Sequence, residues 1–279
     1  MSHSELRFDE IGYWSEVKLD IVKDYATAYS TILAAQQNPR LHHVYIDAFA
    51  GAGVHVSRTT GGFVAGSPLN ALAVTPPFGE FYFIEIDHSK VEMLHELSRT
   101  RPEVHVYEGD CNKILLQTVF PRVRFEDYRR GLCILDPYGL HLDWEVPRAA
   151  GQMKSLDVFL NFPVMDMNRN VLWTNPSAVS ASQRERMNRS WGDESWQKEI
   201  YDGSADLFGY ETKGSNQDVA DRYRERLLRV AGFDYVPSPI PMRNSKGAVI
   251  YYLFFASHKA VAADIVGHIF DKYRRRMPR

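Results

Sequence analysis

The sequence has few cysteines and no long apolar run. Cys111 and Cys133 are the only cysteines among 279 residues, and neither has a Cys-x-x-Cys partner. This argues against a disulfide framework and against a zinc ribbon. No apolar run approaches the roughly 20 residues that a membrane-spanning helix needs, and the polar, acidic segment MSHSELRFDE is unlike a secretory signal. We therefore expect a cytoplasmic protein with buried reduced thiols, no metal site and no membrane partner.

The chain also lacks a strong charge of either sign. Its net charge of −2 argues against wholesale electrostatic binding of nucleic acid, although a local basic face would not show in the total. The apolar fraction of 44% and the charged fraction of 24% are ordinary for a globular protein. Because the length suits one large domain, we interpret residues 1–279 as a single domain with an insertion.

The order of apolar segments predicts an α/β fold. After an amphipathic helix over about 15–37, five short apolar runs alternate with helical patterns, as buried parallel strands do in a doubly wound sheet. The runs are 43–46, 81–86, 104–107, 132–135 and 158–162, and the helical patterns between them are 68–74, 89–100, 113–120 and 144–153. Later come a helix at about 217–231, a hairpin of strands near 235–240 and 248–256, and a helix over 259–275. About seven strands ending in a hairpin is the layout of a class I methyltransferase-like Rossmann fold.

Residues 163–215 interrupt this pattern. They contain no strand-like run, so we expect a helical insertion or lid after the fifth strand. Arginines at 184, 186 and 189 precede Trp191 and Trp196. Arginines interleaved with aromatics suit contact with nucleic acid, but the same aromatics can form the small core of a lid. The sequence leaves both interpretations open.

The most informative segment is HHVYIDAFAGAGVH, in which a strand ends at Asp47 and a glycine loop follows. Gly51 and Gly53 allow a tight turn and close approach to a ligand. A dinucleotide fingerprint would need a third glycine where Val56 stands, and the Lys-Ser/Thr pair of a phosphate-binding loop is absent. The form Asp-x-Phe-x-Gly-x-Gly, which includes Phe49, instead resembles the first motif of methyltransferases. It predicts S-adenosylmethionine as the cofactor, with its methionine end across the loop.

Acidic residues follow the next two strands. Glu85 and Asp87 end the second strand, where a carboxylate can accept hydrogen bonds from both ribose hydroxyls, and we favour Glu85. Asp110 follows the third strand, where the methyltransferase pattern has an acid near the adenine amino group, and Cys111 beside it is assigned to the same pocket. Successive acids at strand ends make a chance arrangement improbable.

The fourth strand ends in Asp136-Pro137-Tyr138-Gly139. This resembles the Asp/Asn-Pro-Pro-aromatic motif of methyltransferases that act on amino groups. The carboxylate and a backbone carbonyl would hold the N–H groups of an exocyclic amine, and Tyr138 would stack on a base of RNA or DNA, which is worth roughly 1–3 kcal/mol. The second proline is missing, and the motif also resembles that of tRNA guanine-N2 methyltransferases. The alternative is a simple turn in which Asp136 caps the next segment.

The fifth strand is followed by more polar residues. Asn161, Asp166, Asn168 and Arg169 are expected to gather at the same sheet edge. Arg169 could clamp a phosphate or carboxylate in bidentate fashion. It could equally cap a helix or pair with Asp166, and the sequence does not decide between these roles.

Several stretches together resemble the three-Cys-motif partner protein family. They are Trp14 with Lys18, YIDAFAGAG, GSPLNAL, FIEID, GDCN, LDPYG, NFPVMDMNR, the stretch from Trp191 to Trp196, and YYLFFAS. The resemblance covers residues from about 14 to about 270. It implies a bacterial, archaeal or phage protein, a second protein with a three-cysteine motif as partner, and the cofactor and reaction-edge residues named above.

Two functions remain open from the sequence. The first is an S-adenosylmethionine-dependent N-methyltransferase that modifies an exocyclic amine. The second is a cofactor-binding partner or scaffold of the three-cysteine protein with little or no turnover, which the imperfect fourth motif favours. A nicotinamide-dependent oxidoreductase is disfavoured by the missing third glycine. The role of Lys18 on the first helix is undetermined.

Overall fold

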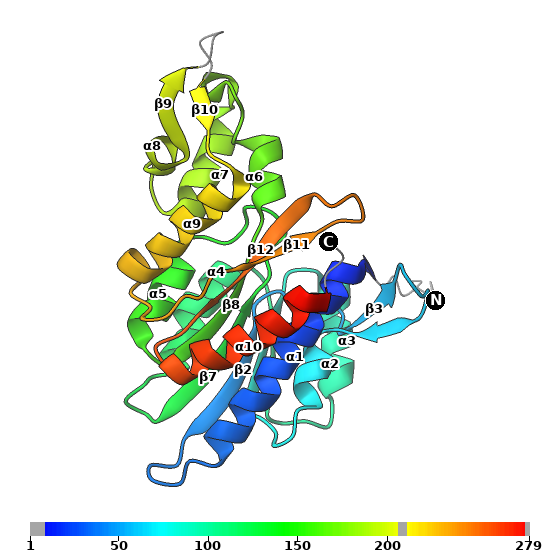
Figure 1. The fold of residues 1–279 in the computed structure, drawn as a ribbon. Helices are drawn as coiled ribbons and strands as arrows, with labels where there is room; N and C mark the ends of the chain where they lie inside the picture. Colours follow the sequence, from blue (N-terminus) through cyan, green and yellow to red (C-terminus); the bar gives the residue numbers. More distant parts are fainter. Residues whose placement is uncertain (1–8, 206–210, 277–279) are drawn as a thin grey trace.

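A seven-stranded sheet forms the centre of the protein (Figure 1). The computed structural model describes residues 9–205 and 211–276. The strand order is β11-β12-β8-β7-β2-β5-β6. The strands are β2 (His42–Asp47), β5 (Glu80–Glu85), β6 (Val104–Glu108), β7 (Arg129–Leu135), β8 (Leu156–Phe162), β11 (Ile240–Arg243) and β12 (Val249–Ala256). The five from β2 to β8 pair in parallel, and β12 runs antiparallel to both β8 and β11. The predicted Rossmann fold with a terminal hairpin is therefore confirmed.

Helices cover both faces of this sheet because every central strand is apolar on both sides. In β2, Val44 and Ile46 belong to one buried cluster and Tyr45 belongs to the other, as the two-residue period of a strand requires. One face packs against α1 (Tyr13–Ala34), α2 (Ser67–Leu72), α3 (His88–Ser98) and α10 (Ala260–Arg276). The other packs against α4 (Cys111–Ile114), the π-helical η1 (Leu115–Val119), α5 (Glu145–Met153), α9 (Asn216–Arg226) and the π-helical η4 (Leu227–Ala231).

One predicted boundary is wrong. The strand expected near 235–240 begins only at Ile240, and Tyr235 makes a single isolated bridge to Ser257. Pro237 and Pro239 explain the shift, because proline has no N–H with which to join a strand ladder.

The insertion after β8 is not purely helical. It contains α6 (Val164–Asn170), the short 3-10 turn η3 (Pro176–Ala178), α7 (Ala181–Trp191) and α8 (Trp196–Ile200). It also contains an antiparallel pair, β9 (Tyr201–Ala205) and β10 (Glu211–Lys213), so the expectation that 163–215 holds no strand is wrong. These two short strands form a separate two-stranded sheet at the far end of the insertion (Figure 1). Because they are not part of the buried central sheet, they do not need the long apolar run by which a strand is predicted from sequence.

A second unpredicted element is a small sheet formed by β1 (Glu10–Ile11), β3 (Val54–Ser57) and β4 (Phe63–Ala65). Strands of two to four residues carry too little periodicity to be recognised in a sequence. This sheet brings the N-terminal residues Asp9 and Ile11 to the carboxyl edge of the main sheet. No helix among residues 9–205 and 211–276 is both long enough and apolar enough to cross a membrane.

Candidate functional site

Two adjoining cavities lie at the carboxyl ends of the parallel strands, which is where ligands bind in open α/β sheets. The first has a volume of about 420 Å³ and extends from Lys18 on α1 to Arg169 on α6. The second has a volume of about 560 Å³ and lies beside Asp110 and Cys111. Phe49, Glu85 and Tyr138 contribute to the walls of both cavities, so the two form neighbouring parts of one site.

The glycine loop turns directly beneath the first cavity. Gly51 has φ +64° and Gly53 has φ +80°, a left-handed conformation that glycine adopts without strain. Gly51 and Phe49 line the cavity. Gly53 lies outside both walls, and its carbonyl accepts a hydrogen bond from Gly66 at 2.8 Å. Of the two predicted glycines, Gly51 approaches the space for a ligand and Gly53 fastens the loop to the start of α2.

Asp47 lies behind this loop and has no exposed surface. Its Oδ1 accepts a hydrogen bond from the backbone N–H of Phe49 at 3.3 Å, and the Ser67 hydroxyl lies beside the same carboxyl. Burial raises the pKa of this carboxyl to about 7 because removal from water disfavours the charged form. Asp47 therefore supports the loop from behind and does not form part of the cavity wall.

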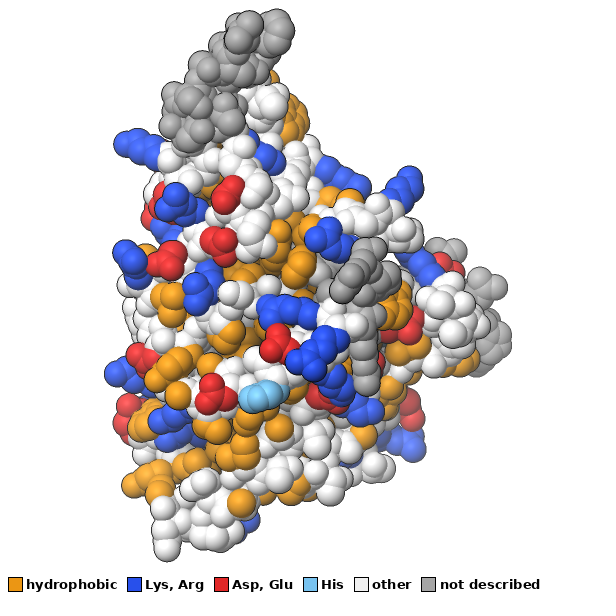
Figure 2. All heavy atoms as spheres, in the orientation of Figure 1, with side chains coloured by type: hydrophobic (Ala, Val, Ile, Leu, Met, Phe, Trp, Pro, Cys, Tyr) orange, Lys and Arg blue, Asp and Glu red, His pale blue; other side chains and the backbone are white. Residues whose placement is uncertain are grey.

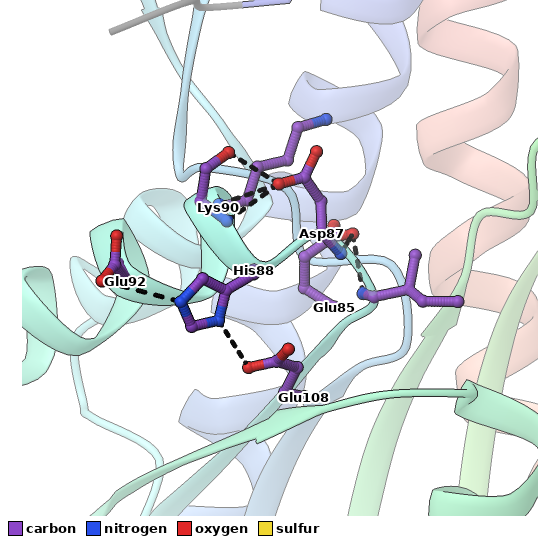
Figure 3. A network of polar contacts seen from close by, with 8 residues as sticks. Glu85, Asp87, His88, Lys90, Glu92 and Glu108 are labelled. Carbon is purple, nitrogen blue, oxygen red and sulfur yellow. Dashed lines mark hydrogen bonds and ion pairs between the residues drawn. The ribbon is translucent and has the colours of Figure 1, made fainter. Parts of the chain in front are cut away.

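Glu85 and Asp87 differ in what they contact (Figure 3). The carboxylate of Glu85 accepts from the backbone N–H groups of Gly51 (2.9 Å), Ile86 (2.8 Å) and Asp87 (3.0 Å). These use three of its roughly four acceptor positions. Asp87 instead caps α3, with Oδ1 accepting from the Ser89 hydroxyl at 2.6 Å and from the backbone N–H groups of Ser89 and Lys90. The hydroxyl bond first, and then the backbone bonds, lower the pKa of its carboxyl. Glu85 lines both cavities and Asp87 lines neither.

The second cavity combines acids, a thiol and an exposed apolar side chain. Asp110 caps α4, and Oδ1 accepts from the backbone and side chain of Asn112 at 3.0 Å each. Burial raises the pKa of the Cys111 thiol to about 12, so this thiol stays protonated. Ile86 is 73% exposed and lines the cavity. An apolar side chain beside acidic hydrogen-bond acceptors suits a purine ring that carries an amino group.

Asp136 lines the first cavity. Its Oδ2 accepts a hydrogen bond from the Lys18 ammonium, and its Oδ1 accepts from the Asn161 amide at 2.8 Å. Pro137 is buried beside it, whereas Tyr138 is 75% exposed and lines both cavities. The expected alternative, in which Asp136 caps the following segment, is not what the structure shows, because its partners come from α1 and β8.

The rest of the Asp136–Gly139 loop is held by Asp166 on α6. The Asp166 carboxylate accepts from the backbone N–H of Leu140 at 3.2 Å and from Asn170 at 2.8 Å. Gly139 has φ +60°, and a Cβ atom there would lie 2.6 Å from Asp166 Oδ2. Glycine is required at this position by both the backbone conformation and the close approach.

The polar residues predicted at the end of β8 and just after it separate into two groups. Asn161, Asp166 and Arg169 line the first cavity. Asn168 points away, where it bonds Lys213 at 2.6 Å and Asn216 at 2.8 Å. The ion pair of Asp166 is with Arg186, at 3.7 Å, and Arg169 has no ion pair with any described residue. Arg169 is therefore exposed at the cavity with its guanidinium available.

The insertion buries Trp191 and Trp196, the two tryptophans that follow its arginines, so these two do not form a binding surface. Trp191 and Trp196 are 0% and 1% exposed, and their indole groups donate to Ser195 and Asn188. They form the core of the insertion. Trp173 is 40% exposed, and Arg189 lines the second cavity. Figure 2 shows basic side chains spread over the insertion with acidic ones among them, and no uniformly basic face in that view.

Sequence reasoning missed several residues of the site. They are Asp9, His55, Ile86, Lys90 and Tyr251. Lys90 pairs with Asp9 at 2.6 Å, and this pair exists only because the small sheet brings residue 9 to the start of α3. Tyr251 lies within the apolar strand β12, where nothing in the sequence distinguishes it from a core residue. Ile86 directly follows Glu85 and could have been noticed as an apolar residue just beyond a strand end.

Comparison with known proteins supports the fold. No protein-family model matches the chain, and no curated protein sequence matches it. A Legionella pneumophila protein of the DUF519 family has a similar structure, with a TM-score of 0.54, 11% identity and coverage of 91% of both chains. The DszA carbon methyltransferase is also similar, with a TM-score of 0.41 and 15% identity; the match covers 84% of this chain and 52% of that one. For Trm5b from Pyrococcus abyssi the TM-score is 0.36 and the identity 14%; the match covers 84% of this chain and 48% of that one.

The first of these likenesses shows a shared overall fold, and the strand order of the sheet identifies that fold. The protein has a class I methyltransferase-like Rossmann fold, with a seven-stranded sheet and an insertion after β8. Fold alone does not assign an activity, so function has to be argued from the residues that surround the two cavities.

Proposed function

We propose that the protein is an S-adenosylmethionine-dependent methyltransferase that acts on an exocyclic amine of a base in RNA or DNA. The observation that carries this proposal is the position of Asp136. Its carboxylate stands in the wall of the first cavity, directly next to the cavity that Glu85 and Asp110 line. The carboxylate that would accept the N–H groups of the amine is thus adjacent to the acids that would bind the adenosine part of the cofactor.

The residues present fit the cofactor. Glu85 has about one acceptor position left for a ribose hydroxyl, and a second would become available if the Gly51 N–H were released. Asp110 and Ile86 would hold the adenine ring in the second cavity, beside Cys111. The methionine end would extend past Phe49 and Gly51 into the first cavity. When bound, S-adenosylmethionine supplies a methyl group on a positively charged sulfur, which keeps the bonding electrons when the methyl group leaves.

The chain's own residues would orient the amine. Asp136 and the backbone carbonyl of Pro137 accept its N–H groups, which turns the nitrogen lone pair toward the methyl group. Tyr138 is exposed enough to stack on the base. After the new N–C bond forms, the amine proton is acidic and passes to Asp136 or to water. Arg169, which lines the same cavity, would bind a neighbouring phosphate in bidentate fashion.

A second candidate function is a cofactor-binding scaffold with little turnover. The contact between Lys18 and Asp136 favours it, because the lysine already occupies part of the carboxylate that an amine would need. Both candidate functions, the methyltransferase and the scaffold, include the proposal that the chain belongs to the three-Cys-motif partner family and binds a three-cysteine protein. It would be tested by co-purification with such a protein encoded beside this one.

Calorimetric titration with S-adenosylmethionine and S-adenosylhomocysteine is the first test. Binding in the micromolar range, about −8 kcal/mol, is expected for both. Transfer of tritiated methyl groups to unmodified RNA and DNA then separates the two candidates. Binding with transfer supports the enzyme, binding without transfer to any acceptor supports the scaffold, and absence of binding contradicts both.

A further inference from the structure

Lys18 is a buried lysine whose ammonium lies inside the proposed acceptor site. It comes from the first turns of α1, and its side chain is 13% exposed. The ammonium bonds Asp136 Oδ2 and stands 5.7 Å from the ring centre of Tyr251 on β12. Burial opposes its charge, but the Asp136 carboxylate more than offsets this, so the pKa of Lys18 is raised and the residue stays protonated.

A largely buried ion pair of this kind, with Lys18 13% and Asp136 30% exposed, is weak evidence for a stabilising role. Removing two charges from water costs about as much as their attraction returns, so apolar side chains would serve stability equally well. The pair also leaves hydrogen-bonding capacity facing the cavity. An ammonium has three N–H groups, and one bond to a carboxylate is described for Lys18.

The wall of the first cavity thus presents a donor and an acceptor side by side. Lys18 is a donor only and Asp136 is an acceptor only. The exocyclic amines of adenine and cytosine each stand next to a ring nitrogen that accepts a hydrogen bond on the Watson–Crick edge, whereas the ring nitrogen beside the guanine amine on that edge is an N–H donor. An enzyme that takes a base out of its stack reads this edge with such groups. The pattern on the wall is the complement of that edge.

We propose that Lys18 determines acceptor specificity by donating a hydrogen bond to the ring nitrogen beside the amine that Asp136 holds. This rests on the proposed methyltransferase function and narrows it. The acceptor is a neutral amine on a heteroaromatic ring. A protonated aliphatic amine, such as a protein lysine, is excluded because its charge would lie next to the Lys18 ammonium in a site sheltered from water.

The test compares acceptors that differ only in the ring nitrogen. Wild-type protein is first given tritiated S-adenosylmethionine with unmodified RNA and DNA oligonucleotides and with poly-lysine, and the methylated base is identified. That base is then replaced by its deaza analogue, in which the neighbouring ring nitrogen is C–H. We expect kcat/KM of the wild type to fall at least about tenfold on the analogue, as loss of one hydrogen bond to a charged group implies.

Lys18→Met decides whether the lysine is responsible. The variant is expected to have lower kcat/KM on the natural base and a ratio between natural and deaza acceptor close to one, with S-adenosylmethionine affinity unchanged by calorimetry. Lys272→Met is the matched control, since it removes another lysine–aspartate pair of α1, with Asp24 at 2.6 Å, outside both cavity walls and leaves Lys18 and Asp136 in place. It should keep the wild-type ratio.

Three results would overturn the inference. A merely structural Lys18 would lower kcat/KM equally on both acceptors and leave the ratio unchanged in Lys18→Met. Preferred methylation of poly-lysine would contradict the exclusion of aliphatic amines. Cofactor binding without methyl transfer to any probe would contradict the methyltransferase function, and the inference with it. This result differs from the first two because the wild-type protein itself is then inactive.

Discussion

The carboxylate of Glu85 accepts a hydrogen bond from the backbone N–H of Gly51 at 2.9 Å, which ties the end of β5 to the glycine loop after β2. The side chain predicted to bind ribose is therefore also the one that positions the loop beneath the methionine end of the cofactor. This double connection makes Glu85 the most informative residue for testing the cofactor site.

Glu85→Gln should weaken S-adenosylmethionine binding about 10- to 100-fold. The amide would turn a donor toward one of the three backbone N–H groups, and hydrogen bonds to a charged group are worth about 1.5–3 kcal/mol. Calorimetry measures the change. Glu108→Gln on the neighbouring strand is the control, since Glu108 bonds His88 at 2.9 Å and lies outside both cavity walls. Equal affinity in the two variants would contradict the assignment of Glu85.

Asp136→Asn should keep cofactor affinity and lower kcat about 10²–10³-fold, the usual effect of removing one preorganised polar group from a reaction site. Because the substitution leaves the Lys18 charge buried without its partner, stability is expected to fall as well. The double variant Lys18→Met with Asp136→Asn should regain stability in thermal unfolding while staying inactive. Full activity of the single variant in a partner assay would instead indicate a scaffold.

Asp47 should make stability depend on pH. Burial raises its pKa in the folded protein from an ordinary 3.8 to about 7. Between these values the unfolded chain is ionised and the folded protein holds the proton, so the free energy of unfolding falls as pH rises from about 4 to about 7. The slope from one such group is at most about 1.4 kcal/mol per pH unit. Denaturant unfolding of Asp47→Asn across this range should show a flatter profile than the wild type. Parallel profiles would mean that Asp47 does not titrate there.

Gly139→Ala should destabilise the protein and disturb the Asp136–Tyr138 loop. A left-handed backbone costs a residue with a Cβ about 1–2 kcal/mol, and the added carbon would lie 2.6 Å from Asp166 Oδ2. Gly61→Ala separates these effects, since Gly61 has φ +70° with nothing within 4 Å of an added Cβ. The melting temperature and methyl transfer should fall more for Gly139→Ala. Equal losses would show that the Asp166 contact contributes nothing.

The sequence alone predicted the central sheet, because its strands are apolar runs whose length and spacing leave few alternatives. Asp47, Glu85, Asp110 and Asp136 each follow such a run. Since parallel strands end at one edge of a sheet, the approximate grouping of these four acids follows from the sequence. Their individual contacts do not. The capping by Asp87 depends on where α3 begins, and the burial of Asp47 depends on how the loop folds over it.

What only the tertiary structure decided is how distant segments meet. Lys18 and Asp136 are 118 residues apart, and the N-terminal strand β1 reaches the cavity by pairing with β3. Sequence periodicity reports local burial, whereas these contacts depend on helix packing and on strands too short to leave a pattern. The sequence therefore determined the fold and the edge at which the site lies. The packing of α1 against the sheet decided that a lysine stands beside the carboxylate proposed to hold the amine.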